Sequence, residues 1–136
     1  MKNTDFKILV VDDDMDDLEI FCEAINEINP SIKCLIARHG KEAIKVLNEL
    51  PTLPHIIFLD YNMPQMNGQK CLAYIKSDER FKTIPVVMYS TYFSYETANQ
   101  LEKEGAVVLK KHDKFSDITN HIFQTLKSFY PLMEII

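Results

Sequence analysis

Short apolar runs alternate with longer stretches of helical periodicity along this chain, and this alternation limits its fold more than any other feature. The apolar runs extend over Lys7 to Val11, Cys34 to Ala37, Ile56 to Leu59, Pro85 to Tyr89 and Val107 to Leu109. Continuous apolar runs of this length are typical of strands that are covered on both faces. Each run is followed by a stretch with apolar residues at steps of three and four, which predicts a helix.

Strands that alternate with helices in this way predict a parallel sheet with right-handed crossovers. Five such units in 136 residues fit an α/β, flavodoxin-like fold. We therefore expect a doubly wound five-stranded parallel sheet of order 2-1-3-4-5, with helices on both faces. The last helical stretch uses up the chain, so we expect one domain over residues 1–136.

Acidic residues close two of the apolar runs. Asp12, Asp13 and Asp14 follow the first run, and Asp60 follows the third. In the predicted order these two strands are neighbours, and ligands bind at the carboxyl ends of strands in open parallel sheets. Two carboxylates ~4 Å apart repel by about 4 kcal/mol at an effective dielectric constant near 20. A hard cation with oxygen ligands would offset this repulsion, and Mg²⁺ is the usual one where phosphate is involved.

Two further strand ends add a hydroxyl group and an amine to the same edge. The fourth run is followed by Ser90 and Thr91, and the fifth by Lys110 and Lys111. A carboxylate can act as a nucleophile and form an aspartyl phosphate. A metal ion and a lysine can neutralise charge on a phosphoryl group, and a hydroxyl can donate to one of its oxygens.

Four segments carry a resemblance to a known family. They are ILVVDDD, FLDYNMPQMNG, IPVVMYST and the lysine-containing end of the fifth strand. In these segments the chain resembles the receiver domains of response regulators in two-component signalling, of the CheY-like, stand-alone type. The resemblance extends over nearly the whole chain, and its most specific segment runs from Asp60 through Gly68.

The resemblance implies a role for each polar strand end. It makes Asp60 the phosphoacceptor, Ser90 the switch hydroxyl and Lys111 the lysine that contacts the phosphoryl group. Mg²⁺ would be bound by Asp60, by Asp13 directly and by Asp12 through water. The backbone carbonyl of Asn62 would complete the protein ligands.

The resemblance also implies partners. A histidine kinase or a phosphotransfer protein would donate the phosphoryl group, and a downstream protein would read the conformational change. A homodimer through the fourth helix, fifth strand and fifth helix is a further expectation, as is a cytoplasmic location. The chain would be a signalling protein that catalyses only its own phosphorylation and dephosphorylation, not an enzyme acting on other substrates.

The composition of the chain argues against DNA binding and against a membrane protein. The net charge of −5 argues against direct DNA binding, which normally requires a basic surface. No apolar stretch approaches ~18 residues, so we expect no membrane span. The cysteines, Cys22, Cys34 and Cys71, are far apart in the sequence, and we expect them to be reduced thiols.

Two positions depart from the family pattern. The family usually has Lys-Pro after the fifth strand, whereas this chain has Lys111-His112. Lys111, Lys110 and His112 are therefore all candidates for the lysine position, and Lys111 is preferred because Lys110 should point to the opposite face of the strand. Val108 stands where the family usually has an aromatic switch residue. The family's usual coupling between this aromatic side chain and the switch hydroxyl, here Ser90, is therefore in doubt.

Two alternative functions remain open. A Mg²⁺-dependent aspartyl-phosphate hydrolase of the haloacid dehalogenase type would use Asp12 as its nucleophile, within Asp12-x-Asp14. The Gly-Thr that should follow is replaced by Met15-Asp16. A pseudo-receiver that only binds proteins, without phosphorylation, is the other alternative.

Overall fold

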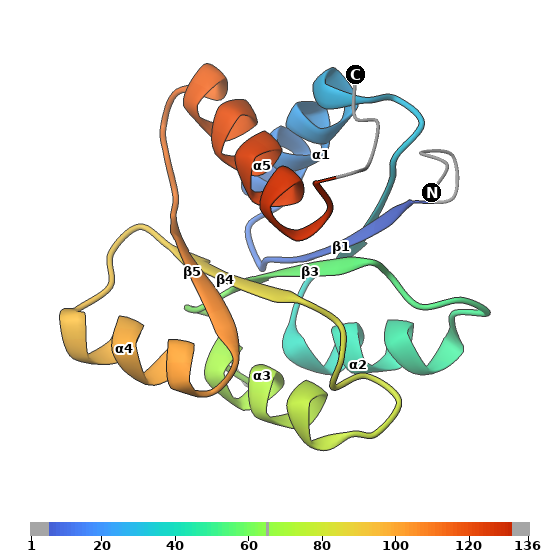
Figure 1. Ribbon diagram of the computed structural model, residues 1–136, viewed down its shortest axis with the longest axis vertical. Coiled ribbons are helices and arrows are strands. Elements are labelled where there is room, and N and C mark those ends of the chain that lie inside the picture. Colours follow the sequence, from blue (N-terminus) through green and yellow to red (C-terminus); the bar gives the residue numbers. More distant parts are fainter. Residues whose placement is uncertain (1–5, 65, 132–136) are drawn as a thin grey trace.

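The computed structural model describes residues 6–64 and 66–131, and it confirms the predicted sheet (Figure 1). All neighbouring strands are parallel, in the order β2-β1-β3-β4-β5. The strands are β1 (Lys7–Val11), β2 (Lys33–Ala37), β3 (Ile56–Asp60), β4 (Val86–Ser90) and β5 (Ala106–Lys110). The helices are α1 (Met15–Ile28), α2 (Gly40–Glu49), α3 (Gly68–Ser77), α4 (Tyr95–Lys103) and α5 (Phe115–Phe129). The predicted domain of residues 1–136 also includes residues 1–5 and 132–136, which lie outside the described part.

Two helix layers cover the sheet. In Figure 1, α1 and α5 lie on one face, and α2, α3 and α4 lie on the other. Side chains alternate along each strand, so Ile8 and Val10 pack under α1 and α5 while Leu9 and Val11 pack against the opposite layer. Each fully buried Leu, Ile or Phe stabilises the fold by about 1.5–3 kcal/mol. This two-sided burial explains why the strands are apolar without interruption.

The central strands end on the functional residues. β3 and β4 are buried over their whole length, and their last residues are Asp60 and Ser90. Both predicted strands therefore end one residue too early, because a polar side chain closes each of them. These two side chains are consequently held by strands in the middle of the sheet instead of by mobile loops.

Local chemistry sets the loops around this edge. Asp14 caps the N-terminus of α1, and its carboxylate accepts hydrogen bonds from the backbone N–H groups of Asp16 and Asp17. Gly68 begins α3 so close to the end of β3 that an added Cβ atom would collide with the carbonyl oxygen of Asp60 and lie 2.8 Å from the Met88 sulfur. The loop between β3 and α3 can therefore pack here only with glycine at position 68.

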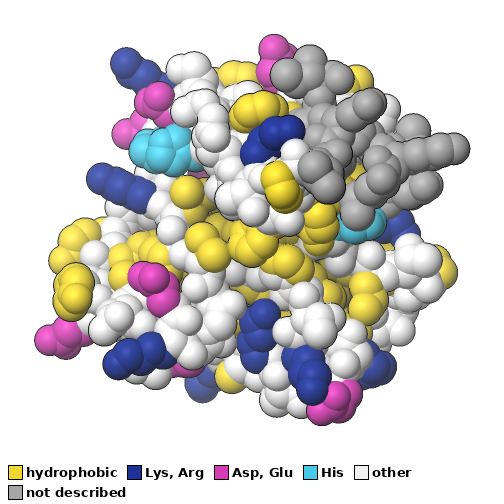
Figure 2. Space-filling model, in the orientation of Figure 1, with side chains coloured by type: hydrophobic (Ala, Val, Ile, Leu, Met, Phe, Trp, Pro, Cys, Tyr) yellow, Lys and Arg dark blue, Asp and Glu magenta, His cyan; other side chains and the backbone are white. Residues whose placement is uncertain are grey.

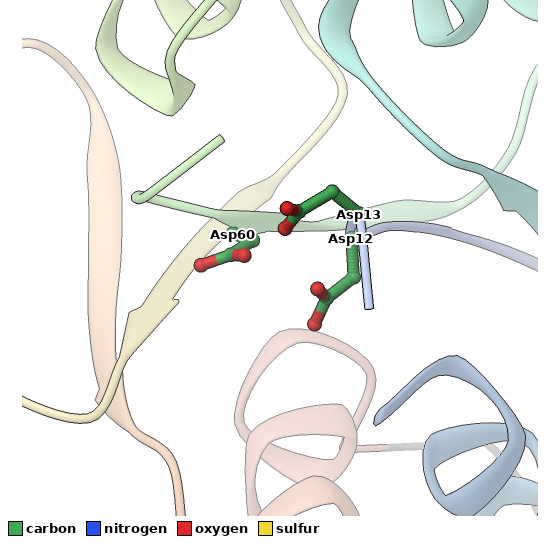
Figure 3. Close-up of side chains that lie close together, drawn as sticks. All are labelled: Asp12, Asp13 and Asp60. Atoms are coloured by element: carbon green, nitrogen blue, oxygen red, sulfur yellow. The ribbon is translucent and has the colours of Figure 1, made fainter. Parts of the chain in front are cut away.

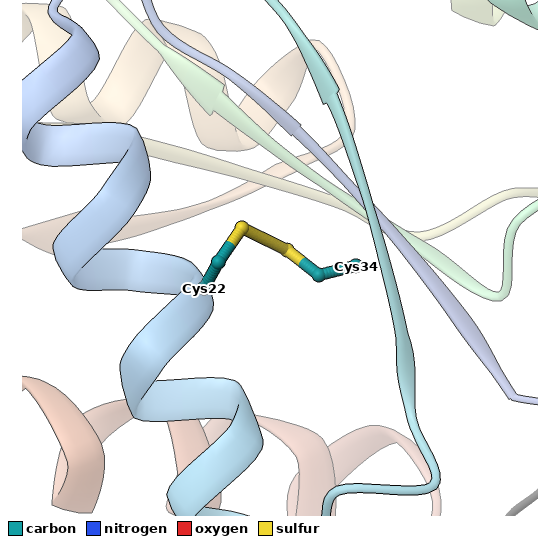
Figure 4. The surroundings of a disulfide bond; sticks show 2 residues. All are labelled: Cys22 and Cys34. Carbon is teal, nitrogen blue, oxygen red and sulfur yellow. A yellow bond between two sulfur atoms is a disulfide. The ribbon is translucent and has the colours of Figure 1, made fainter.

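The cysteines differ from the sequence-based prediction. Cys22 on α1 and Cys34 on β2 form a disulfide bond (Figure 4), and their Cα atoms are 6.0 Å apart, within the usual range. Cys71 is a buried free thiol, and burial raises its pKa to about 12. The prediction of reduced thiols is wrong for the first two cysteines, because the fold brings α1 against β2 although 12 residues separate them.

The surface shows a band of hydrophobic side chains across the middle of the view in Figure 2, with charged side chains mostly around it. Among the exposed large hydrophobic residues are Tyr92 and Tyr95, which are 75% and 85% exposed. No helix among the described residues has the length and apolar character needed to cross a membrane.

Candidate functional site

Three carboxylates meet at the carboxyl edge of the sheet (Figure 3). The residue pair Val11 and Leu59 is in register between β1 and β3, so Asp12 and Asp60 follow side by side. Asp12, Asp13 and Asp60 each offer an oxygen atom, and these atoms all lie within 4.8 Å of one another. The predicted convergence of these residues is therefore present in the structure.

Asp12 is the most enclosed of the three, with none of its surface exposed. Its Oδ1 atom accepts a hydrogen bond from the backbone N–H of Asp14 at 3.0 Å. Its Oδ2 atom accepts one from the Tyr89 hydroxyl at 2.8 Å. Burial and the neighbouring charge of Asp12 raise the pKa of Tyr89 well above its usual value, so the phenol keeps its proton and acts as the donor.

The amine of Lys111 lies among three carboxylates, two that follow or end strands and one in the first turn of α1. Its Nζ atom is 3.0 Å from a carboxylate oxygen of Asp17, 3.2 Å from one of Asp12 and 3.7 Å from one of Asp60. The backbone N–H of Lys111 donates to the carbonyl of Ser90 at 2.8 Å, which fixes this residue beside the end of β4. Burial lowers the pKa of Lys111, but the hydrogen bond to Asp17 and the nearby carboxylate charges raise it above its usual value.

The three candidates for the lysine position therefore lie in different places. Lys110 is the last residue of β5, and its side chain is exposed. This agrees with the expectation that adjacent side chains of a strand, here those of Lys110 and Lys111, point to opposite faces. His112 lies against the His121 ring, with ring centroids 4.0 Å apart. Among Lys110, Lys111 and His112, it is Lys111 whose side chain reaches the carboxylates.

Asp60 sits in a poorly solvated position, with 5% of its side chain exposed. Its Oδ1 atom accepts a hydrogen bond from the backbone N–H of Asn62 at 3.1 Å. Burial and then the charge of Asp12 raise the pKa of Asp60 to about 7, although Lys111 and the Asn62 N–H oppose this shift. A cation bound beside Asp60 would favour its charged form.

Ser90 and Asn62 join the ends of β4 and β3. The Ser90 hydroxyl oxygen accepts hydrogen bonds from the side-chain amide of Asn62 at 3.0 Å and from the backbone N–H of Tyr92 at 3.4 Å. Ser90 is 1% exposed, so this hydroxyl lies inside the site. The hydroxyl proton is not used by these contacts and can be donated to an oxygen placed nearby.

Val108 packs among the residues on the α2, α3 and α4 side of the sheet. The rings of Tyr61 and Phe93 lie against the same cluster and contact one another at 5.6 Å between centroids. Val108 and this aromatic pair, which comes from the loops that follow β3 and β4, thus belong to the same side of the sheet.

Three contributions to the site were missed by sequence reasoning: the hydroxyl of Tyr89, the carboxylate of Asp17 and the side-chain amide of Asn62. One signal for Tyr89 was available, since it is a phenol in an otherwise aliphatic run. Asp17 is one helical turn beyond Asp14, the N-cap of α1. Its side chain faces the site because α1 begins at Met15.

The site as a whole can hold a cation and an anion together. Three carboxylates supply hard oxygen ligands for the cation. The amine of Lys111 lies 3.7 Å from an Asp60 oxygen, and Asn62 joins Asp60 to the Ser90 hydroxyl, since its backbone N–H donates to Asp60 and its side-chain amide donates to Ser90. Such a set suits the transfer of a phosphoryl group to a carboxylate.

The chain is similar to known proteins over most of its length. The family model of the response regulator receiver domain matches residues 8–123. Chemotaxis protein CheY1 of Helicobacter pylori (strain ATCC 700392 / 26695) is 35% identical over 85 residues, which is 62% of this chain and 67% of that protein. The two-component response regulator ORR5 of Oryza sativa subsp. japonica is 31% identical over 99 residues, 73% of this chain and 72% of that protein.

Solved structures agree with this match. The phosphorylated cyanobacterial phytochrome response regulator RcpA has a TM-score of 0.84 and 25% identity, with 96% of this chain and 97% of that chain covered. The Mn²⁺-bound form of the response regulator Rcp1 has a TM-score of 0.79 and 25% identity, over 96% of this chain and 99% of that chain. The family match, the sheet order and the acidic edge lead to one conclusion: this chain belongs to the response regulator receiver domain family, the signalling domains of two-component systems.

Proposed function

We propose that this chain accepts a phosphoryl group on Asp60 in a Mg²⁺-dependent reaction, from a histidine kinase or a phosphotransfer protein. The observation that carries the proposal is the position of Asp60. Its carboxylate ends a buried central strand, and it lies beside two further carboxylates and within 3.7 Å of the Lys111 amine. The phosphorylated state of RcpA and the Mn²⁺-bound form of Rcp1 among similar structures support it.

The donor set fits Mg²⁺. Asp12, Asp13 and Asp60 present only oxygen ligands, and burial together with the charge of Asp12 raises the pKa of Asp60. Asp13 and Asp60 would hold the ion, with Asp12 acting through water and the Asn62 carbonyl as a further ligand. A bound Mg²⁺ would neutralise charge on the oxygens of the incoming phosphoryl group.

The residues of this chain supply the rest of the chemistry. An oxygen of Asp60 attacks phosphorus, the new O–P bond forms as the N–P bond of the donor phosphohistidine breaks, and the imidazole leaves. The amine of Lys111, which already contacts Asp12 and Asp60, can then form an ion pair with a phosphoryl oxygen. Ser90 can donate its hydroxyl proton to another phosphoryl oxygen, which would draw the end of β4 toward Asp60.

Contacts of Asp12 support Asp60 over Asp12 as the nucleophile. One oxygen of Asp12 accepts the Tyr89 hydroxyl and lies beside Lys111, and the other accepts a backbone N–H. These donors lower the nucleophilicity of Asp12 and hold it in one orientation. A haloacid dehalogenase-type reaction, which would begin at Asp12, is thus less suited to this geometry.

Signalling would follow from protein contacts. We propose that a downstream protein in the cytoplasm reads the phosphorylated state, without membrane insertion and without direct DNA binding. Exposed Tyr95 on α4 and Val107 on β5, which are 85% and 43% exposed, support the α4, β5 and α5 face as the surface for a partner or a homodimer.

Mass spectrometry of the intact protein tests the proposal. After incubation with acetyl phosphate and Mg²⁺, the parent protein should gain one phosphoryl group, and it should gain none in the presence of EDTA. Asp60→Asn should remain unmodified, while Asp117→Asn, a change of an exposed carboxylate in the first turn of α5, should behave as the parent does. Equal modification of Asp60→Asn and the parent would refute the assignment.

A further inference from the structure

The side chain of Tyr89 lies on the α1 and α5 side of the sheet, and its hydroxyl extends into the acidic site. Its ring packs with the side chains under α1 and α5, where it contacts the Phe21 ring at 5.8 Å between centroids. It is 4% exposed, yet its hydroxyl donates to Asp12 Oδ2 at 2.8 Å. The Lys111 amine lies 5.0 Å from the centroid of the same ring, within the range of a cation–π contact. Tyr89 therefore touches both the innermost carboxylate and the amine of the site.

The contacts of Asp12 leave it little capacity for a metal ion. An ionised carboxylate has about four lone-pair positions, two on each oxygen. On Oδ2, one accepts the Tyr89 hydroxyl, and the Lys111 amine forms an ion pair with the same oxygen at 3.2 Å. On Oδ1, one accepts the backbone N–H of Asp14. A single position, on Oδ1, remains for a metal ion or for a metal-bound water.

Asp13 differs from Asp12 in this respect. It is exposed, and no hydrogen bond or ion pair joins it to another of the described residues, so both of its oxygens remain available. Of these two residues, Asp13 thus offers an unrestricted carboxylate, whereas Asp12 is restricted to a single oxygen. Mg²⁺ needs few protein ligands and retains several waters, whereas Ca²⁺ takes more oxygen ligands and often binds a carboxylate through both oxygens.

We infer that Tyr89 is a positioning residue that blocks two-oxygen binding by Asp12 and so makes the site prefer Mg²⁺ to Ca²⁺. The Tyr89 hydroxyl occupies the position on Asp12 Oδ2 that Ca²⁺ would need. The Tyr89 ring, through its contact with the Lys111 amine, holds this amine beside the same oxygen. The inference depends on the metal site of the proposed function, but it does not depend on phosphorylation.

Calorimetric titration of the unphosphorylated full chain with Mg²⁺ alone and with Ca²⁺ alone tests this inference. Tyr89→Phe keeps the ring and removes the hydroxyl. Because a hydrogen bond to a charged group is lost at Oδ2, Ca²⁺ should bind about tenfold more tightly relative to Mg²⁺ than in the parent. Tyr130→Phe is the matched control, since it removes a hydroxyl that donates to the His55 carbonyl at 2.6 Å, and its Ca²⁺-to-Mg²⁺ ratio should equal that of the parent.

A structural role alone would change both affinities in parallel, so an unchanged ratio in Tyr89→Phe overturns the inference while leaving the proposed function intact. Absence of Mg²⁺ binding to the parent would overturn the inference and the metal part of the proposed function together. A second measurement needs no variant. The ¹³C resonance of the Tyr89 Cζ atom should stay at its metal-free position when Mg²⁺ is added, and a large displacement would show that the hydroxyl gives up Asp12 to the ion.

Discussion

Lys111 is the one cation that the described residues place among the acidic groups of this site, and it is shared by Asp12, Asp17 and Asp60. A single amine cannot offset four carboxylates when Asp13 is included. The excess negative charge adds, through Asp12, to the larger effect of burial in raising the pKa of Asp60, although Lys111 lies close by. It also explains how a site of this kind attracts a divalent ion before a phosphoryl group arrives.

Replacement of the two adjacent lysines should have unequal effects. Lys111→Ala removes the amine beside Asp12, which has no exposed surface, and should lower the free energy of unfolding by about 2 kcal/mol. Lys110→Ala alters an exposed residue and should change it by less than about 0.5 kcal/mol. Urea unfolding without metal measures both. Lys111→Ala should also weaken the conformational response to beryllofluoride, and a larger response loss in Lys110→Ala would contradict the assignment.

The positions of Asp12, Asp13, Asp60 and Ser90 followed from the sequence because each closes an apolar run. Strand ends in a parallel sheet share one edge, so the run boundaries alone placed these residues together. Tyr89 and the Asn62 amide could not be placed in this way. Their contacts depend on side-chain directions across neighbouring strands, and a tyrosine one residue before Ser90 faces the other side of the sheet by alternation.

At the scale of the elements, the same reasoning placed every strand to within about a residue, because burial on both faces leaves an uninterrupted apolar signal. The fourth helix had the weakest signal, and Leu101 is its only buried residue. The Cys22–Cys34 bond lay beyond sequence reasoning, because it depends on how closely α1 packs against β2.

The start of α3 depends on Gly68. Gly68→Ala should displace the end of β3, since its Cβ atom would collide with the Asp60 carbonyl and the Met88 sulfur. We expect it to lower the free energy of unfolding by about 1–3 kcal/mol and to weaken Mg²⁺ binding. Gly105→Ala is the control, because residue 105 has a φ of 98° and lies at the end of α4. That change should cost about 1–2 kcal/mol in stability and leave Mg²⁺ affinity as it is. Equal Mg²⁺ affinity in both variants would count against this view of Gly68.

The disulfide should stabilise the packing of α1 on β2. Reduction should lower the free energy of unfolding by up to about 3 kcal/mol, as expected for a loop of this size. Thiol titration of the folded protein should find two reactive thiols after reduction and none before, because Cys71 is buried with a pKa of about 12. The double variant Cys22→Ser/Cys34→Ser should be insensitive to the reductant. Two reactive thiols in the untreated folded protein would show that the bond is absent.

At the scale of the whole molecule, the charge of the site couples stability to pH. The pKa of Asp60 is about 7 in the folded protein, against an ordinary value of 3.8. Between these values the folded state binds more protons than the unfolded chain, so without metal the free energy of unfolding falls as the pH rises and levels off above pH 7. The limit of this loss is about 4 kcal/mol.

Asp60→Asn removes this titrating group and should therefore be more stable than the parent, by a margin that grows from about pH 4 to about pH 7. Thermal unfolding in EDTA across this range measures the margin. Saturating Mg²⁺ should reduce it, because the cation favours the charged form of Asp60. A margin that is independent of pH would show that Asp60 titrates normally, and Asp117→Asn should show no such margin.

If the proposed function is right, Asp60 and no other residue carries the phosphoryl group. An aspartyl phosphate is an acyl phosphate, and borohydride reduces it to homoserine, which marks the modified position permanently. After phosphorylation with acetyl phosphate and Mg²⁺, reduction and proteolysis, peptide mass spectrometry should find homoserine at position 60 alone. Homoserine at position 12 would instead support the hydrolase alternative, and its absence from every peptide would support a receiver that signals without phosphorylation.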